Sequence, residues 1–210
     1  MGRAFTEEDL KILHTNLIES GRRYAEKYGF KKTSIDELVT DVGISKGMFY
    51  KFFSSKESFF FEVRETVEKE IQDIIKNIFL KKMANPKEDL VNNFCELFHV
   101  IREPKYAPFF NDDELDYLLR RLPKDEIEKD VKRDIIVTSD ILNMVGIPID
   151  SSIIDVEMIT GVIRSIFLTS MNSRSIGEDT IDSVIRFHIE SVVAYVSNCV
   201  LNMTEYQKLN

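Results

Sequence analysis

Residues 29–60 read GFKKTSIDELVTDVGISKGMFYKFFSSKESFF, and this stretch decides how the N-terminal part of the chain folds. Ser34 and Glu37 have the S-x-x-E spacing of a capping box, which predicts a short helix that begins at about Ile35. Gly43 follows the apolar residues of this helix and suits the sharp turn that ends it.

A second short helix is expected directly after that turn. Ser45 is placed to cap it, because a serine at this position can accept a hydrogen bond from a free backbone N–H group of the first turn. Two short helices that are joined at a glycine predict a helix-turn-helix over residues 34–53.

A longer helix over residues 6–28 is expected to support this pair, and Gly29 suits its C-terminal cap. Gly21 lies on the apolar stripe of the longer helix, where a missing side chain allows another helix to approach closely. The stripe consists of residues at steps of three and four: Leu10, Leu13, Leu17, Gly21, Tyr24 and Tyr28.

Charge is distributed unevenly along the chain. The 210 residues carry a formal net charge of −8, yet residues 1–56 hold 10 basic and 8 acidic residues. No acidic residue occurs between Val42 and Lys56. A basic module on an acidic chain is typical of a protein that faces a polyanion, although a solvated helix surface gives the same pattern.

The second short helix has features that suit contact with DNA. Gly47 lacks a side chain where a duplex would come nearest, and Met48 can touch a thymine methyl group. Phe49 is expected to point into the core. The residues expected to contact double-stranded DNA are Thr33, Ser34, Ser45, Lys46, Gly47, Met48, Tyr50, Lys51 and Lys56.

This segment closely resembles the N-terminal domain of TetR-family transcriptional regulators, over about 60 residues. The family pattern is Gly-aromatic, a Thr/Ser pair, an Ile/Leu-Ala helix, and Gly-Val-Ser-x-Gly-x-Leu-Tyr-x-x-Phe-x-x-Lys-Glu. The matching positions are Gly29-Phe30, Thr33-Ser34, Leu38-Val39, Gly43-Ile44-Ser45, Gly47, Phe49-Tyr50, Phe53 and Lys56-Glu57. The chain departs from the family pattern at Ser20-Gly21, Val39, Met48 and Phe52.

The resemblance implies an all-α fold of about nine helices. In this fold a three-helix DNA-binding domain, residues 1–56, precedes a larger helical bundle, residues 57–210, for effector binding and dimerisation. It also implies a homodimer that binds a palindromic operator. Apolar spacing beyond residue 56 agrees, and it predicts helices over residues 57–82, 87–101, 111–121, 123–145, 152–172 and 179–204.

The last two predicted helices are apolar on more than one face. Deep burial inside one subunit would explain this pattern, but a homodimer interface is the preferred interpretation. The residues expected in that interface are Ile159, Ile163, Phe167, Ile185, Val192 and Val196.

An effector pocket inside the bundle is a further implication of the resemblance. Aromatic, histidine and methionine side chains are candidates for its lining, although an ordinary core uses the same residue types. The candidates are Phe94, Phe98, His99, Tyr106, Phe110, Tyr117 and Met144, together with Cys95 and Phe109.

Sequence motifs for catalysis or metal binding are missing. There is no P-loop, G-x-G-x-x-G, H-E-x-x-H or C-x-x-C motif, and the three histidines are dispersed. We therefore expect no enzyme, no metal and no cofactor. The widely separated Cys95 and Cys199, and the lack of a secretory or membrane-spanning stretch, predict a cytoplasmic protein with reduced thiols and no membrane partner.

The resemblance to TetR-family regulators, together with the expected apolar pocket, predicts a repressor that a small, mainly apolar ligand releases from its operator. An activator or a ligand-independent DNA-binding protein of the same fold is the alternative. An enzyme that uses the bundle cavity is a third hypothesis, but no nucleophile–base arrangement in the sequence supports it.

Overall fold

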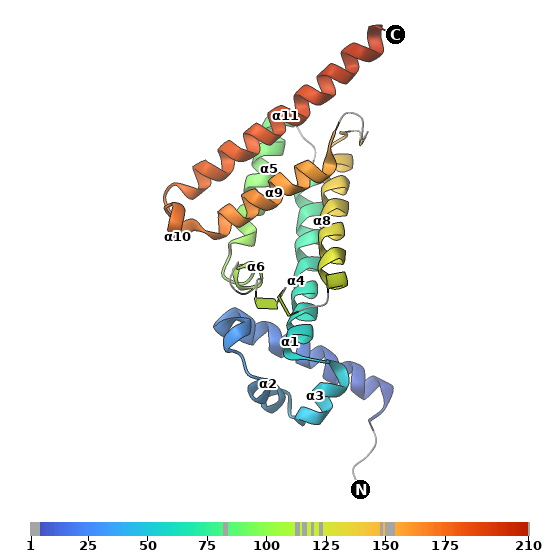
Figure 1. Cartoon of the computed structure of the whole chain (residues 1–210), viewed down its shortest axis with the longest axis vertical. Helices are drawn as coiled ribbons and strands as arrows, with labels where there is room; N and C mark the ends of the chain where they lie inside the picture. The colour runs from blue at the N-terminus through green and yellow to red at the C-terminus, as the bar shows by residue number, and fades with distance from the viewer. Residues whose placement is uncertain are drawn as a thin grey trace. The chain divides into compact units, whose positions relative to one another are not determined.

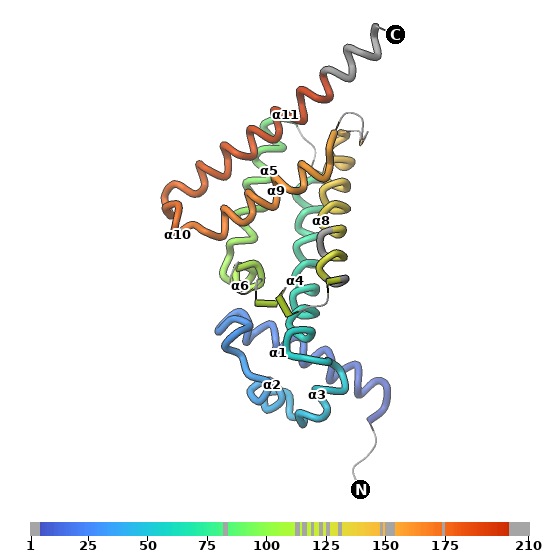
Figure 2. Tube along the Cα trace, viewed as in Figure 1, coloured from blue at the N-terminus to red at the C-terminus, as the bar shows by residue number. Residues whose placement is uncertain are grey.

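The computed structural model describes residues 5–81, 84–111, 114, 117–118, 120–121, 124–147, 149 and 154–209 (Figure 2). These residues form helices and the connections between them, with no strand in the described ranges. The expected all-α fold is thereby confirmed.

The chain forms two compact units, and each is described separately. The first consists of Met1–Glu70 and Pro104–Pro123, and the second of Ile71–Glu103 and Lys124–Asn210. The first unit therefore continues past the expected boundary at residue 56. It does so because the first half of a long helix and the segment 104–123 pack with the N-terminal helices.

The first unit is built around a helix-turn-helix (Figure 1). Its helix α1 packs on α2 and on α6, and α2 packs on α3. The elements are α1 (Glu7–Lys32), α2 (Ile35–Val42), α3 (Lys46–Phe52), the N-terminal part of α4 (Lys56–Phe79), and α6 (Ala107–Phe110).

Phenylalanine rings fill the core of this unit. Phe59 is fully buried and packs edge-to-face on Phe49, with 5.2 Å between the ring centroids. A Cβ atom at Gly21 would lie 2.8 Å from Phe59 Cε1 and 2.9 Å from Val63 Cγ2. The missing side chain at Gly21 therefore allows α1 and α4 to approach closely, as the sequence predicts, and Phe49 is a core residue.

The C-terminal end of α1 differs from the prediction. Tyr28 was expected on the buried stripe, but it is 45% exposed, and the Lys27 ammonium lies 4.9 Å from the centre of its ring. The buried face follows Leu17, Gly21 and Ala25 at steps of four, so Tyr28 lies beyond it. The helical backbone is interrupted at the expected position, because Gly29 has φ 78°, but α1 continues to Lys32 and its C-cap is Thr33.

The second unit is a helical bundle (Figure 1). Helix α11 packs on α5 and on α9, and α8 also packs on α9. Five of the eleven residues of the helix predicted over residues 111–121 lie outside the described residues. The elements are the C-terminal part of α4, α5 (Pro86–Ile101), α8 (Lys124–Met144), α9 (Val156–Met171), α10 (Ser173–Ile176) and α11 (Ile181–Leu209).

Within the described ranges, Ile181–Leu201 of α11 is the one stretch that is long and apolar enough to cross a membrane. Length and composition alone support that interpretation. The same stretch packs against α5 and α9 through buried side chains such as Ile185 and Ile189, and it exposes Arg186 and Glu190. A helix with one buried and one partly charged face is usual in the bundle of a soluble protein.

Candidate functional site

The turn between α2 and α3 has the geometry that its sequence predicts. The Ser34 hydroxyl accepts a hydrogen bond from the Glu37 N–H group at 3.2 Å, and the Glu37 carboxylate accepts one from the Ser34 N–H group at 2.9 Å. These bonds from the backbone and hydroxyl of Ser34 lower the pKa of Glu37. Gly43 lies in the left-handed region with φ 74°, a conformation that favours glycine. The capping box and this glycine fix the direction in which α3 leaves α2.

Helix α3 has one buried and one exposed face. Ser45 caps the helix, since its hydroxyl accepts a hydrogen bond from the Met48 N–H group at 3.2 Å. Phe49 points inward and is fully buried, whereas Tyr50 is 53% exposed. We call the remaining outward-facing residues the recognition surface: Ser34, Ser45, Lys46, Gly47, Met48, Tyr50 and Lys51.

Gly47 is not required by the packing of the protein itself. A Cβ atom added there would meet a single neighbour, the Ser45 hydroxyl oxygen at 3.8 Å. Glycine inside a helix costs about 0.5–1 kcal/mol relative to alanine. A glycine that the fold does not need, at an exposed position of a short helix, suits a surface that another molecule approaches closely.

Lys46 is the basic residue nearest the start of α3. Its ammonium lies 2.8 Å from the Asp36 carboxylate of α2, and the hydrogen bond with Asp36 raises the pKa of Lys46. Both side chains are exposed, and such pairs contribute only about 0–1 kcal/mol. The ammonium can therefore exchange this partner for a phosphate at little cost.

Two residues that the sequence placed on this surface make hydrogen bonds to the backbone near the end of α1. Thr33 is 1% exposed, and its hydroxyl donates a hydrogen bond to the Gly29 carbonyl at 2.8 Å. The half-buried Lys56 donates from its ammonium to the Lys31 carbonyl at 3.0 Å, and burial lowers its pKa. Both side chains bind the backbone at the connection between α1 and α2, and the Thr33 side chain is buried there.

An exposed basic pair, Lys31 and Lys32, lies immediately before Thr33 and was not among the expected contacts. The Lys-Lys pair is visible in the sequence. Whether the two lysines can contact DNA depends on the exposure of their side chains, and the sequence pattern does not predict that exposure.

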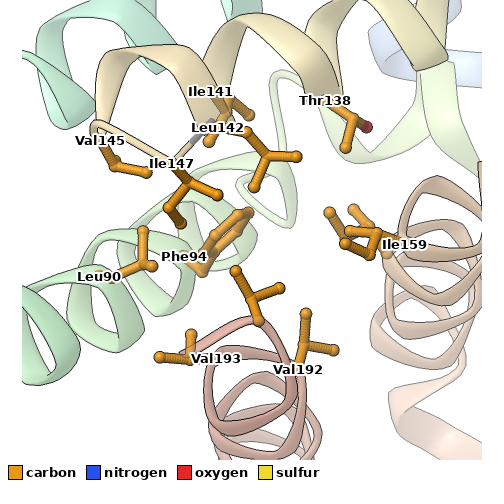
Figure 3. A pocket seen from close by; sticks show the side chains of 12 residues that line it. Leu90, Phe94, Thr138, Ile141, Leu142, Val145, Ile147, Ile159, Val192 and Val193 are labelled. Carbon is orange, nitrogen blue, oxygen red and sulfur yellow. The ribbon is translucent and has the colours of Figure 1, made fainter. Parts of the chain in front are cut away.

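A small cavity lies inside the second unit (Figure 3). The volume open to the centre of a water molecule is about 20 Å³, enough for a single water. Helices α5, α8, α9 and α11 and the turn after α8 surround it. The lining residues are Leu90, Phe94, Thr138, Ile141, Leu142, Val145, Ile147, Ile159, Ile163, Val192, Val193 and Val196.

The cavity wall offers almost no polar group. Thr138 is the one lining residue with a side-chain hydroxyl, and that group donates a hydrogen bond to the Asp134 carbonyl at 2.9 Å. All the other lining side chains are hydrocarbon. A molecule in this space would gain free energy from apolar contact and would find few hydrogen-bond partners.

The segment that forms the helix-turn-helix matches a known family. Residues 17–63, which contain α2, α3 and the turn between them, match the family model described as bacterial regulatory proteins, tetR family. The N-terminal domain is a TetR-family domain. No curated protein matches the chain in sequence at a significant level.

Solved structures of TetR-family regulators have the same overall fold. A TetR transcriptional regulator from Rhodococcus sp. RHA1 is 15% identical with a TM-score of 0.62, over 87% of this chain and 96% of that chain. A TetR-family regulator from Pectobacterium atrosepticum is 16% identical with a TM-score of 0.59, over 92% and 94%. RolR in complex with the ligand resorcinol is 17% identical with a TM-score of 0.59, over 91% and 96%.

The second unit does not gather the expected effector residues around the cavity, although Cys95 and His99 line one surface groove together. Phe94 alone lines the cavity. Phe98 is buried elsewhere, His99 is exposed, and Met144 is half-buried outside the lining. The remaining candidates, Tyr106, Phe109, Phe110 and Tyr117, belong to the first unit, and Cys95 faces a surface groove of the second. Sequence reasoning missed the aliphatic lining, because such residues occur in every helical core and carry no signal of their own.

Three of the expected interface residues are also core residues. Ile159 and Ile185 are each 2% exposed and Val196 is 4% exposed, so a partner subunit could not reach them. Phe167, Ile163 and Val192 are partly buried, and the last two line the cavity. The apolar side chains that α9 and α11 do expose are Met158, Val162, Leu168, Phe187, Tyr195 and Leu201.

Within the residues that the structure describes, no three histidine, cysteine, aspartate or glutamate side chains lie close enough together to hold a metal ion.

Proposed function

We propose that this TetR-type protein is a sequence-specific DNA-binding transcriptional regulator that contacts the major groove through the recognition surface. The observation that carries the proposal is the exposed face of α3, which has no acidic residue and carries Gly47 in open space. The absence of a side chain lets a duplex come close, while Lys46 and Lys51 supply charge to the phosphates.

The protein acts as a homodimer. Helices α9 and α11 expose large apolar side chains, among them Phe187 and Leu201, and a second copy is the partner that covers them. Gly161 supports this proposal, because a Cβ atom there would meet nothing within 4 Å although glycine weakens the middle of a helix. The two-fold axis of the dimer would direct two α3 helices to the half-sites of a palindromic operator.

The protein is a cytoplasmic repressor that a small apolar ligand releases from its operator. The ligand enters the cavity of the second unit, which has to expand from about 20 Å³ to accept it. The ligand binds the protein with the expanded cavity more tightly, and DNA binds the protein with the small cavity more tightly. Each therefore lowers the affinity of the protein for the other by the same factor. RolR binds resorcinol, but the hydrocarbon wall described above favours a ligand with fewer polar groups.

An activator or a ligand-independent DNA-binding protein is the second candidate. The small volume of the cavity favours the ligand-independent form. The two candidates share the recognition surface and differ in whether a ligand changes the affinity for DNA.

Selection of duplexes from a random-sequence library by the purified protein tests DNA binding directly. We expect a palindromic consensus, and an affinity that falls steeply as salt rises because neutralised phosphates release counterions. Failure to enrich any sequence, or an affinity that salt does not change, would contradict the proposal.

Thermal unfolding with toluene or with resorcinol tests the ligand. Toluene should raise the unfolding temperature and weaken binding to the selected duplex, and resorcinol should do neither at the same concentration. If no apolar compound changes the affinity for DNA, the ligand-independent form is supported.

A further inference from the structure

Both hydrogen-bonding groups of one backbone residue, Lys31, are held by distant side chains. The Lys31 N–H group donates to Glu114 Oε2 at 3.0 Å. The Lys31 carbonyl accepts from the Lys56 ammonium at 3.0 Å. We call this arrangement the Lys31 clamp. Hydrogen bonds in which one partner is charged are stronger than neutral ones, so the two halves of the clamp restrain the peptide groups on both sides of the Lys31 Cα.

The clamp lies where the path of the chain into the helix-turn-helix is decided. Lys31 lies between the backbone break at Gly29, φ 78°, and Ser34, which caps α2. A Cβ atom on Gly29 would lie 2.8 Å from Glu114 Oε1, so the carboxylate lies directly against the bare Cα of this glycine. Any change in the position of Lys31 changes the direction in which α2 leaves α1. Since α3 packs on α2, its exposed face moves too.

Glu114 belongs to the segment 104–123, which is anchored on the first unit by further contacts. The Tyr117 hydroxyl donates to the Glu57 carboxylate at 2.8 Å, at the start of α4. The Phe109 ring packs on Phe30 with 5.7 Å between the centroids, and both rings are fully buried. Glu114 is thus held in place by the same unit whose backbone it binds.

We propose that Glu114 is a positioning residue for α3, and that it acts by holding the backbone of Lys31 in the clamp. The proposal rests on the proposed function of α3 in DNA binding. With the clamp formed, α2 and α3 keep one direction. With it released, residues 31–34 gain conformational freedom that DNA binding has to remove again, and affinity falls.

Three variants of the full-length protein test this proposal. Glu114→Ala removes the acceptor of the Lys31 N–H group. Glu114→Gln keeps a neutral acceptor oxygen on a side chain of the same length. Glu128→Ala is the matched control, because Glu128 is exposed on α8 in the second unit. Amide hydrogen exchange and affinity for a duplex selected by the wild-type protein are measured for each.

We expect Glu114→Ala to speed exchange over residues 31–42, to leave α11 unchanged and to weaken DNA binding about tenfold, or 1.4 kcal/mol. Glu114→Gln should recover most of the affinity, and Glu128→Ala should behave as wild type. Wild-type exchange and affinity in Glu114→Ala would overturn the proposal. Faster exchange throughout the first unit, Leu17–Ala25 included, would also overturn it, because Glu114 would then only stabilise the fold.

The two proposals fail in different ways. If the wild-type protein selects no duplex, the proposed function fails. Faster exchange confined to residues 31–42 in Glu114→Ala would still support the clamp. Lys56→Met removes the other half of the clamp and provides a second variant if Glu114→Ala does not fold. It should speed exchange in the same residues, and unchanged exchange there would overturn the clamp.

Discussion

The Lys46 ammonium of α3 lies 2.8 Å from the Asp36 carboxylate of α2. This pair connects the two helices of the helix-turn-helix on their solvent side. Because both side chains are exposed, the pair contributes little to stability, and its main effect is to place a carboxylate beside the proposed DNA-binding surface.

Asp36→Asn should increase the affinity for the selected duplex about threefold to tenfold, because it removes a group that competes for Lys46 and repels phosphate. Lys46→Ala should decrease the affinity and reduce the slope of log affinity against log salt by about 1. Gel-shift titrations over a range of salt concentrations measure both effects. Glu19→Gln makes the same charge change on the exposed side of α1 and should alter affinity less. An unchanged affinity in Asp36→Asn would show that Asp36 does not compete with DNA.

Gly47→Ala should have opposite effects on stability and on binding. Alanine should stabilise α3 by about 0.5–1 kcal/mol, since the added methyl group meets no protein atom closer than 3.8 Å. The same methyl group should weaken DNA binding because it occupies the space where the duplex comes nearest. Urea unfolding and gel shifts measure the two effects.

Gly43→Ala is the matched control for Gly47→Ala. It should destabilise the protein, because alanine rarely adopts φ 74°. If Gly47→Ala binds DNA as tightly as wild type, α3 does not approach the duplex at this position.

Local signals in the sequence were sufficient to predict the helix-turn-helix. The Ser34–Glu37 capping box, the left-handed Gly43 and the Ser45 cap each depend on residues within a few positions, and the structure confirms all three. Thr33 and Lys56 were expected at the surface, but Thr33 is buried and Lys56 is half-buried. Their hydrogen bonds reach Gly29 and Lys31, and the sequence pattern does not indicate whether such polar groups face solvent or a neighbouring backbone.

The second unit was harder to predict for a related reason. Hydrophobic periodicity shows that a helix has two apolar faces, but it does not tell which face meets its own core. Ile185 and Phe187 differ by two positions on α11, yet the first is buried and the second is 67% exposed. The clamp at Lys31 joins residues 83 positions apart, and no local pattern encodes it.

Phe187→Asp should convert the dimer to monomers without unfolding the bundle, because it places a charge in the proposed interface on a side chain that the subunit does not bury. Sedimentation velocity and circular dichroism measure the two properties. Val196→Asp is the contrasting variant. It should unfold the second unit, because Val196 is 4% exposed and a charge there would lie unpaired in the core. Dimers that persist in Phe187→Asp would place the interface elsewhere.

Phe94→Ala should enlarge the cavity and destabilise the protein by about 3–5 kcal/mol, as truncations of buried rings do. Benzene should restore part of this stability by filling the space that the ring leaves. Thermal unfolding with and without benzene measures the effect. Phe98→Ala is the control, because Phe98 is a buried ring on the same helix but does not line the cavity. If benzene restored more stability to Phe98→Ala than to Phe94→Ala, that result would argue against a ligand site at this cavity.

Acid should weaken the cap of α2 through Glu37. Hydrogen bonds from the Ser34 backbone and hydroxyl lower the pKa of Glu37 below its ordinary value of 4.5. A carboxylate whose folded-state pKa is depressed contributes stability above pH 4.5, and this contribution is lost as the pH falls through the folded-state value. Glu37→Gln should therefore lose less stability than wild type between pH 6 and pH 3, as measured by urea unfolding. Glu19→Gln should follow the wild-type curve. Parallel curves for Glu37→Gln and wild type would show that the ionised carboxylate does not stabilise the start of α2.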